Sequence, residues 1–454
     1  MTLAPTPAAA PYGRSDRLPT ANEPPVPESI RDTGLSEEFV VDLLLKTLYV
    51  QGARTGSQLV SAVRLPFAFV DDRLLSLQQR RLVEVLGTSG PNRGAYVFNL
   101  TTAGRDRARE ALASSQYVGP APVPLPQYRT WVEKQTIRNV HVTRDVVRDG
   151  FKNMVLGEDV HDVLGPSINS AKSLFLYGAP GNGKTMIAET ISHMLGGDIF
   201  VPFAVEVEGQ IMIVYDPVYH HPVEGPDPLE IQENDVEPAW LKSPPSYDMR
   251  FVKVRRPVVL TGGELTLEQL DLQYDTYTKM YQAPFQVKAN GGVLILDDFG
   301  RQRVPPKDLL NRWIVPLEKR IDFLTLHTGG KFPVPFDTLL IMATNLEPSQ
   351  LVEEAFLRRI HYKIQIHGPD PDQYAEIFAR CCDERGIAYD HDSVLYIYQE
   401  YYGRQGIHPR ACHPRDILDH LVDIARFYEG KAALTNDIVD RACRSYFLDD
   451  VRKE

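Results

Sequence analysis

The sequence predicts an α/β fold built on a parallel sheet, with a small helix-and-hairpin domain before it and a helical domain after it. Three observations predict this organisation. A glycine-rich turn joins a short apolar run at 174–177 to an amphipathic segment. A second apolar run, at 293–296, ends in two acidic residues. Apolar residues in 36–115 repeat first with the period of helices and then with that of strands.

The composition is that of a folded protein rather than a fibrous, membrane-spanning or disordered one. Of the 454 residues, 43% are hydrophobic and 24% are charged, and about 150 residues per domain allows roughly three domains. No apolar run approaches the roughly 18–20 residues of a membrane span. The four cysteines form no CxxC pair, which favours a reduced, cytoplasmic protein. The net charge of −11 disfavours wrapping of nucleic acid by bulk electrostatics.

Clusters of proline divide the chain. Seven of the 35 prolines lie in residues 1–35, which we expect to form a disordered tail. Four more lie in 120–126, so we expect residues 116–130 to form a stiff, extended linker between domains. A cluster of eight in 217–257 indicates an irregular insertion, at about 200–260, inside a larger domain.

Between the tail and the linker, residues 36–115 have the pattern of three helices, a two-stranded hairpin and a final helix. Ser36 can cap the first helix and Gly52 can end it. The whole pattern resembles a winged-helix domain, in which the helix near Val70–Gln79 would enter the major groove of DNA. Ten Lys and Arg against eight Asp and Glu give the segment only a slight positive charge. Binding to protein, or packing alone, is therefore the favoured alternative.

The strongest signal is a phosphate-binding loop with the spacing GxxxxGK[ST] between a predicted strand and a predicted helix. It comprises Gly178, Ala179, Pro180, Gly181, Asn182, Gly183, Lys184 and Thr185, and Met186 follows. Glycines let backbone N–H groups turn toward phosphate oxygens, and the helix N-terminus adds its positive dipole end. Lys184 would place its charge on the β- and γ-phosphates, and Thr185 its hydroxyl on Mg²⁺. The loop therefore predicts binding of ATP with Mg²⁺.

Two carboxylates complete the predicted site. Asp297 and Asp298 follow the apolar run at 293–296. Asp297 would help Thr185 to hold the Mg²⁺ ion, and Asp298 would orient or deprotonate the attacking water.

With these motifs the chain resembles the AAA+ ATPase family of P-loop motors, from about residue 131 to its end. The resemblance implies an α/β ATPase core at 131–366 and a helical lid at 367–454. It implies that Asn345 is the sensor-1 residue, which contacts the water or the γ-phosphate. It also implies an arginine finger, Arg359 with Arg358 in reserve, that reaches the ATP of a neighbouring subunit, and a lid residue, Arg415, that points at the γ-phosphate.

Two details of the resemblance concern the second motif and the segment after it. The family usually has Asp-Glu where this chain has Asp-Asp, as helicase-loader and replication-initiator members also do. A predicted strand at 322–327, the turn Gly329-Gly330 and a second strand resemble the β-hairpin before sensor 1. That hairpin defines the branch with branch-migration motors, magnesium chelatase, enhancer-binding activators and MoxR-type ATPases. The GAFTGA loop of the activators is absent, which argues against an activator of that kind.

The resemblance implies ATP hydrolysis coupled to conformational work on another macromolecule. Because an arginine finger needs a neighbour, we expect a ring homo-oligomer, with six subunits as the expected size. Two targets remain open: a protein complex that is remodelled or assembled, which the acidic charge favours, and DNA reached through residues 36–115. A third possibility is a slowly hydrolysing ATP switch, which the short Asp298 side chain would permit.

Overall fold

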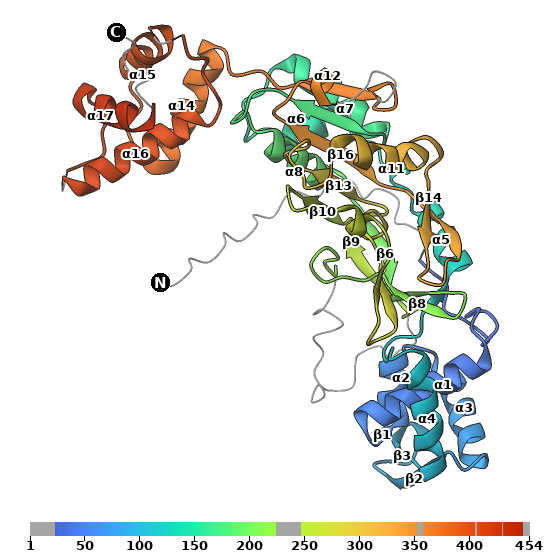
Figure 1. Cartoon of the computed structure of the whole chain (residues 1–454). Helices are drawn as coiled ribbons and strands as arrows, with labels where there is room; N and C mark the ends of the chain where they lie inside the picture. The colour runs from blue at the N-terminus through green and yellow to red at the C-terminus, as the bar shows by residue number, and fades with distance from the viewer. Residues whose placement is uncertain (1–22, 224–246, 352–356, 405, 429, 448–454) are drawn as a thin grey trace.

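The computed structural model describes residues 23–223, 247–351, 357–404, 406–428 and 430–447. The chain forms an elongated, curved molecule (Figure 1). A small N-terminal domain lies at one end, and the C-terminal helices lie at the other. The parallel sheet and a second sheet lie between them, so the chain runs broadly from one end of the molecule to the other.

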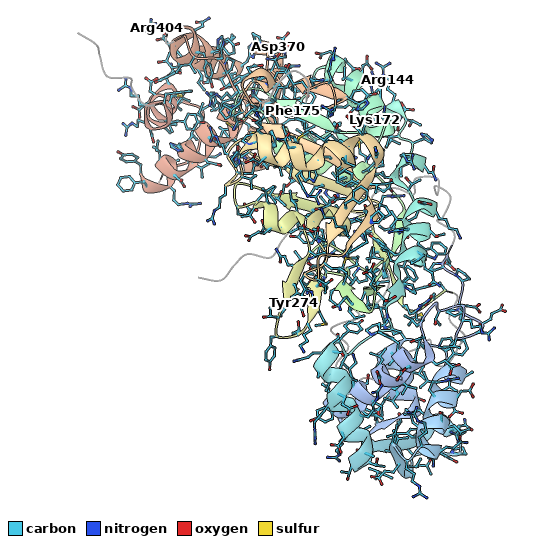
Figure 2. The ribbon with its side chains drawn as sticks, turned by 45° about the vertical axis from the view of Figure 1, so that its right-hand side comes forward. Arg144, Lys172, Phe175, Tyr274, Asp370 and Arg404 are labelled. Atoms are coloured by element: carbon cyan, nitrogen blue, oxygen red, sulfur yellow. The ribbon has the colours of Figure 1, made fainter. Side chains whose placement is uncertain are left out.

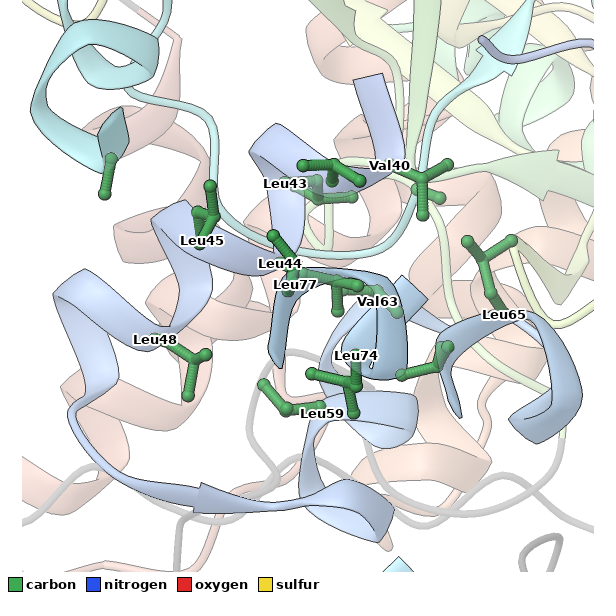
Figure 3. Packing of buried hydrophobic residues seen from close by; sticks show 14 of the residues in the cluster. Val40, Leu43, Leu44, Leu45, Leu48, Leu59, Val63, Leu65, Leu74 and Leu77 are labelled. Atoms are coloured by element: carbon green, nitrogen blue, oxygen red, sulfur yellow. The ribbon is translucent and has the colours of Figure 1, made fainter. Parts of the chain in front are cut away.

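The N-terminal domain has its own core. Its elements are α1 (Glu37–Gln51), β1 (Arg54–Thr55), α2 (Gly56–Val63), α3 (Phe67–Gln79), β2 (Val83–Thr88), β3 (Tyr96–Leu100) and α4 (Thr102–Ser114). The strands form an antiparallel sheet in the order β1-β3-β2. Buried leucines from α1, α2 and α3 meet in the centre (Figure 3). As predicted, the Ser36 side chain caps α1 by accepting a hydrogen bond from the backbone N–H of Phe39.

The segment that the sequence predicts as an extended linker is folded into the molecule. Val123 and Pro124 form the short strand β4, which pairs in parallel with β7 (Ala204–Val207) at the edge of a sheet. The helix α5 (Leu125–Lys134) follows at once, with Pro126 in its first turn. Proline is tolerated at an edge strand and at the start of a helix, because its missing N–H has no partner to lose there. The proline cluster therefore marks the ends of elements rather than a free spacer.

Part of the predicted N-terminal tail is also held in place. Residues 1–22 lie outside the described residues, but Thr33 is fully buried. The guanidinium of Arg250 forms a buried ion pair with Asp248. It also donates to the carbonyl oxygen of Thr33 at 2.9 Å and to that of Pro122 at 3.3 Å. This one cation therefore fastens the end of the tail and the start of the predicted linker to the same point.

The parallel sheet has five strands. They are β5 (Leu174–Tyr177), β10 (Val258–Thr261), β13 (Val293–Leu296), β16 (Leu339–Thr344) and β17 (Tyr362–Gln365). Their order is β10-β13-β16-β5-β17, and every neighbouring pair is parallel. Helices α6 (Arg144–Gly150), α7 (Glu158–Asn169) and α8 (Lys184–Met194) share an apolar core with one face, and α11 (Pro306–Lys319) shares one with the other. The predicted α/β fold with a parallel sheet is confirmed.

The expected insertion after α8 contributes β7 and β8 (Gln210–Ile213) to a second sheet, whose other strands lie outside the insertion. The strand β6 (Asp198–Pro202) pairs with β9 (Phe251–Arg255) as an antiparallel ribbon. The sheet itself has the order β11-β12-β8-β7-β4, with β11 at Gln273–Asp275 and β12 at Met280–Gln282. The proline-rich part of the insertion, 224–246, lies outside the described residues.

The predicted hairpin before β16 is present. The strands β14 (Ile321–Thr325) and β15 (Lys331–Pro335) are antiparallel. Their buried side chains, among them Leu324 and Val334, belong to the same apolar core as the second sheet. The hairpin is therefore packed along one face rather than free on both.

The chain ends in a helical domain. Its elements are α14 (Pro371–Arg385), α15 (His391–Ile397), the π-helical segment η4 (Tyr398–Gly403), α16 (His413–Phe427) and α17 (Asn436–Tyr446). Asp370 caps α14 and lies where this domain joins the parallel sheet (Figure 2). The remaining short elements are η1 (Arg93–Ala95), η2 (Ile137–Asn139), η3 (Leu267–Leu270), α10 (Phe285–Lys288) and α12 (Pro348–Leu351). Across the described parts of the chain, every helix is too short or too polar to cross a membrane.

Candidate functional site

The parallel sheet brings the predicted site together at the carboxyl ends of its strands. The phosphate loop follows β5, Asp297 follows β13 and Asn345 follows β16. The strand β5 lies between two later strands, β16 and β17. In open α/β sheets, ligands bind in the crevice outside the carboxyl ends, at the point where connections leave in opposite directions. The topology alone therefore marks this edge as a place for a ligand.

Glycine conformation shapes the phosphate loop. The φ angles of Gly178, Gly181 and Gly183 are 139°, 84° and 78°, which residues with a side chain rarely adopt. A Cβ atom on Gly178 would also lie 2.3 Å from the carbonyl oxygen of Ile366, at the end of β17. The helix α8 begins at Lys184 directly after this turn. Its first backbone N–H groups have no partners within the helix and favour an anion there.

The Lys184 side chain is folded onto the loop. Its ammonium group donates hydrogen bonds to the carbonyl oxygens of Gly178 and Ala179, each at 2.9 Å. Burial lowers the pKa of Lys184 from its usual value, and the carboxylates of Asp297 and Asp298 oppose this shift. A buried positive charge beside a glycine turn is suited to neutralise phosphate.

Two hydrogen bonds link the acidic residues to the loop and to β16. The Thr185 hydroxyl donates to the Asp297 carboxylate at 2.9 Å. The side-chain amide of Asn345 donates to the Asp298 carboxylate at 3.1 Å. Asp298 has a φ of 47°, in the left-handed region, where Asp and Asn are the side chains best tolerated. The backbone at this position therefore favours the Asp-Asp pair of this chain over the longer Asp-Glu pair.

A cavity of about 460 Å³ opens beside these groups, between the sheet and the helical domain. Its lining includes Gly178, Ala179, Asn182, Asn345, Tyr398 and His408. The volume is in the range of small-ligand pockets. Of the remaining loop residues, Pro180, Gly181 and Met186 are exposed.

The residues present fit a magnesium-bound nucleotide. Only glycine fits at position 178, because of the close contact there, and the loop can therefore curve around a phosphate. Lys184 supplies the positive charge that opposes the negative charge of the phosphates. The Thr185 hydroxyl and the Asp297 carboxylate are adjacent oxygen donors, the kind of ligand that Mg²⁺ prefers while it keeps several waters and substrate phosphates.

The structure does not bring the two predicted finger residues to this site. Arg359 donates to the Glu318 carboxylate at 2.5 Å, and Arg358 is exposed. Both line a second cavity, of about 690 Å³, together with Ser173. Ser173 directly precedes β5, whose other end carries the phosphate loop. The arginines therefore lie at the opposite edge of the sheet from the loop of their own chain.

In the structure Arg415 pairs with a neighbouring carboxylate, and a different arginine lies against the loop. The Arg415 side chain is 58% exposed and pairs with Asp416. Arg410, by contrast, has its Cδ atom 3.5 Å from the position of a Cβ on Gly181, and its charge contributes to the lowered pKa of Lys184. The sequence contains His-Pro-Arg twice, at 408–410 and at 413–415. This repeat could have indicated Arg410 as a second candidate, because the sequence does not show which copy of the motif lies beside the loop.

Residues 370–445 match the model of a domain of unknown function, DUF8689, and no curated protein matches the chain. Among solved structures, the RuvB Holliday junction branch migration motor of Thermotoga maritima is 15% identical, with 66% of this chain and 73% of that chain covered and a TM-score of 0.37. NtrX from Brucella abortus in complex with ADP is 12% identical, with 65% and 52% covered and a TM-score of 0.36.

Proposed function

We propose that the protein binds Mg-ATP in the phosphate loop and hydrolyses it. One observation supports this above all others: the carboxyl ends of three strands bring together the ammonium of Lys184, the hydroxyl of Thr185, two carboxylates and the amide of Asn345. A cavity that Asn345 and the start of the loop line opens at the same edge of the sheet. Each of these groups has a known role in phosphoryl transfer. The residues are far apart in the sequence, and their proximity in the fold is therefore better explained by a shared function than by chance.

The residues of the site have different roles in binding and hydrolysis of ATP. The loop N–H groups and Lys184 bind and orient the phosphates, and Thr185 and Asp297 hold the metal. When bound, Mg²⁺ offsets the negative charge of the phosphates. Asp298 accepts a proton from the attacking water, while Asn345 fixes the direction of that carboxylate through the 3.1 Å hydrogen bond. Since catalysis here is mostly positioning, the rigidity of the strand ends matters as much as the charges.

The second cavity supports a ring of identical subunits. It collects basic side chains at the far edge of the sheet: Arg138, Lys172, Arg320, Arg358, Arg359 and His361, against one carboxylate from Glu318. An anion held there has to come from outside the chain's own loop. The ATP of a neighbouring subunit, expected in a ring of six, would supply that anion, and Arg359 or Arg358 would then act as the finger.

We further propose that the N-terminal domain is a winged helix that recognises a protein rather than DNA. Four of its nine arginines form ion pairs within the domain, among them Arg73 with Glu37 and Arg93 with Asp71. The exposed residues of α3 include Asp72 and the apolar Leu75. An acidic and an apolar side chain on the exposed face of this helix do not attract the phosphates of a DNA duplex. Remodelling or assembly of a protein complex is therefore the target that these residues favour.

Equilibrium titration with a fluorescent ATP analogue tests the proposal. We expect saturable binding that weakens when Mg²⁺ is chelated and is lost in Lys184→Ala. Thr185→Val, which keeps the shape of the side chain, should lose the Mg²⁺ dependence while retaining weak nucleotide binding. Binding that is unchanged in both variants would reject the assignment of the site.

Two further measurements separate the alternatives. Salt-dependent binding of the full chain to duplex DNA, lost on substitution of Arg80 and Arg81, would favour the DNA-directed motor. A single turnover per subunit followed by retained ADP would favour the slow switch over a motor.

A further inference from the structure

Asn182 differs from its neighbours in the phosphate loop because its side chain is buried. The residue is 4% exposed, whereas Pro180 and Gly181 are exposed. Its side-chain carbonyl accepts a hydrogen bond from the backbone N–H of Ala411 at 3.2 Å. Its amide nitrogen is buried without a hydrogen-bond partner. Binding of phosphate by the backbone of the loop does not require a buried side chain at this position. The burial of the Asn182 side chain therefore indicates a second role.

The partner of Asn182 belongs to a segment of the helical domain that lies directly on the loop. The backbone N–H of Cys412 donates to the carbonyl oxygen of Gly181 at 2.9 Å. A Cβ atom on Gly181 would lie 2.5 Å from the Cys412 sulfur. A Cβ on Gly368, at the start of the domain, would lie 2.4 Å from the carbonyl oxygen of Pro409. The backbones are thus in contact on both sides of the segment 409–412.

The same segment is fastened rigidly to the core of the helical domain. His413, the first residue of α16, is 4% exposed. Its Nδ1 atom lies 2.8 Å from the Tyr402 hydroxyl, and the Arg410 N–H donates to it at 3.3 Å. Tyr402 is in turn hydrogen-bonded to Tyr374 of α14. A shift of the segment therefore moves the domain with it instead of being absorbed locally.

We propose that Asn182 is a positioning residue that latches the C-terminal helical domain to the phosphate loop, so that nucleotide binding in the loop is transmitted to that domain. This inference rests on the proposed function. The latch is incomplete, with one hydrogen bond formed and one buried donor left without an acceptor, and such a donor disfavours the arrangement that buries it. The hydrogen bond between Asn182 and Ala411 can therefore be replaced by another when the loop backbone turns toward a phosphate.

Hydrogen exchange of the full-length protein tests the latch, read from peptides that cover residues 408–416. Without nucleotide, Asn182→Ala should speed exchange of the Ala411 amide by about five- to tenfold, the factor for one neutral hydrogen bond. Asn182→Asp keeps an acceptor for Ala411 and removes the unpartnered donor, so exchange should be as slow as in the wild type or slower. Its added negative charge should nevertheless weaken nucleotide binding. Asn99→Ala removes a side-chain amide in the N-terminal domain and is the matched control.

The outcomes keep the latch and the proposed function apart. The comparison without nucleotide involves no ligand, so equal exchange in Asn182→Ala and wild type overturns the latch even if ATP binds. Addition of ADP should change exchange at 408–416 in the wild type and not in Asn182→Ala. An equal response in both would overturn the transmission role, and a wild type that binds no nucleotide would reject the proposed function instead. Thermal unfolding of each variant identifies one that has merely lost its fold.

Discussion

Asp298→Asn separates nucleotide binding from turnover, because it removes a charge without altering the shape of the side chain. Asp298 has a φ of 47°, which Asn also tolerates, so the free energy of unfolding should change by less than about 0.5 kcal/mol. The new side chain can still accept the hydrogen bond from Asn345. The water, however, loses its proton acceptor, which lowers turnover by about 10²–10⁴-fold. That range corresponds to roughly 3–5 kcal/mol in the activation barrier.

The nucleotide affinity should respond differently. Asp298 is one of two carboxylates near Lys184, and its removal lessens the negative charge that a triphosphate meets. We therefore expect ATP affinity that is equal to that of the wild type or higher. The assay combines a fluorescent-nucleotide titration with steady-state phosphate release at saturating ATP. Turnover within a few-fold of the wild type would refute the reasoning and remove Asp298 from the role of base.

Asp298→Glu is the informative companion, since it creates the Asp-Glu pair usual in the family. A longer side chain in the left-handed region should cost about 1 kcal/mol of stability, and its carboxylate no longer ends where Asn345 donates. We expect no gain in turnover from this variant, and a several-fold gain would show that the backbone argument for Asp-Asp is mistaken.

The remaining predictions concern the loop and the neighbouring subunit. Lys184→Ala should abolish ATP binding in a calorimetric titration, and unchanged affinity would contradict the role of the ammonium. Gly178→Ala should lower the free energy of unfolding in urea by about 3 kcal/mol or more, since left-handed strain adds to the 2.3 Å overlap with Ile366. The control Gly209→Ala also has a positive φ, of 79°, but open space around the added Cβ, and should lose only about 1 kcal/mol. Arg359→Ala should bind ATP normally but hydrolyse it slowly, and mixing it with Lys184→Ala subunits should restore activity; no recovery would argue against a finger supplied in trans.

The phosphate loop and the strands around it could be predicted because their signals are local. The run at 174–177, the glycines after it and the acidic pair at 297–298 each combine a strand period with a turn, and the observed strands β5 and β13 lie where those signals place them. Ser36 and its helix were predictable for the same reason, since capping depends on neighbouring residues.

The proline cluster at 120–126 shows what local signals leave open. Proline disfavours the interior of an element, but it does not say whether the chain beside it is free or packed. In this protein Pro124 belongs to an edge strand and Pro126 to the first turn of α5. The partners of both elements lie more than 70 residues away, in β7 and β15, and only the tertiary structure shows that packing.

The lid arginine shows the same limit within the site. His-Pro-Arg occurs twice within eight residues, and no local rule distinguishes the copy that lies beside the phosphate loop. The side chain of Asn182 accepts a hydrogen bond from the backbone N–H of Ala411 and so holds the first copy beside the loop. The two residues are 229 positions apart in the sequence. For Arg359, the ion pair with Glu318 is likewise a tertiary contact, and the sequence gives no sign of it.

The central claim is that the phosphate loop of this chain supports repeated hydrolysis of ATP, and phosphate release under multiple-turnover conditions tests it most directly. Purified full-length protein with excess ATP and Mg²⁺ should release many equivalents of phosphate per subunit. The release should stop when Mg²⁺ is chelated and should be lost in Lys184→Ala and Asp298→Asn alike. Release that stops at one equivalent, or that persists unchanged in Lys184→Ala, would contradict the account.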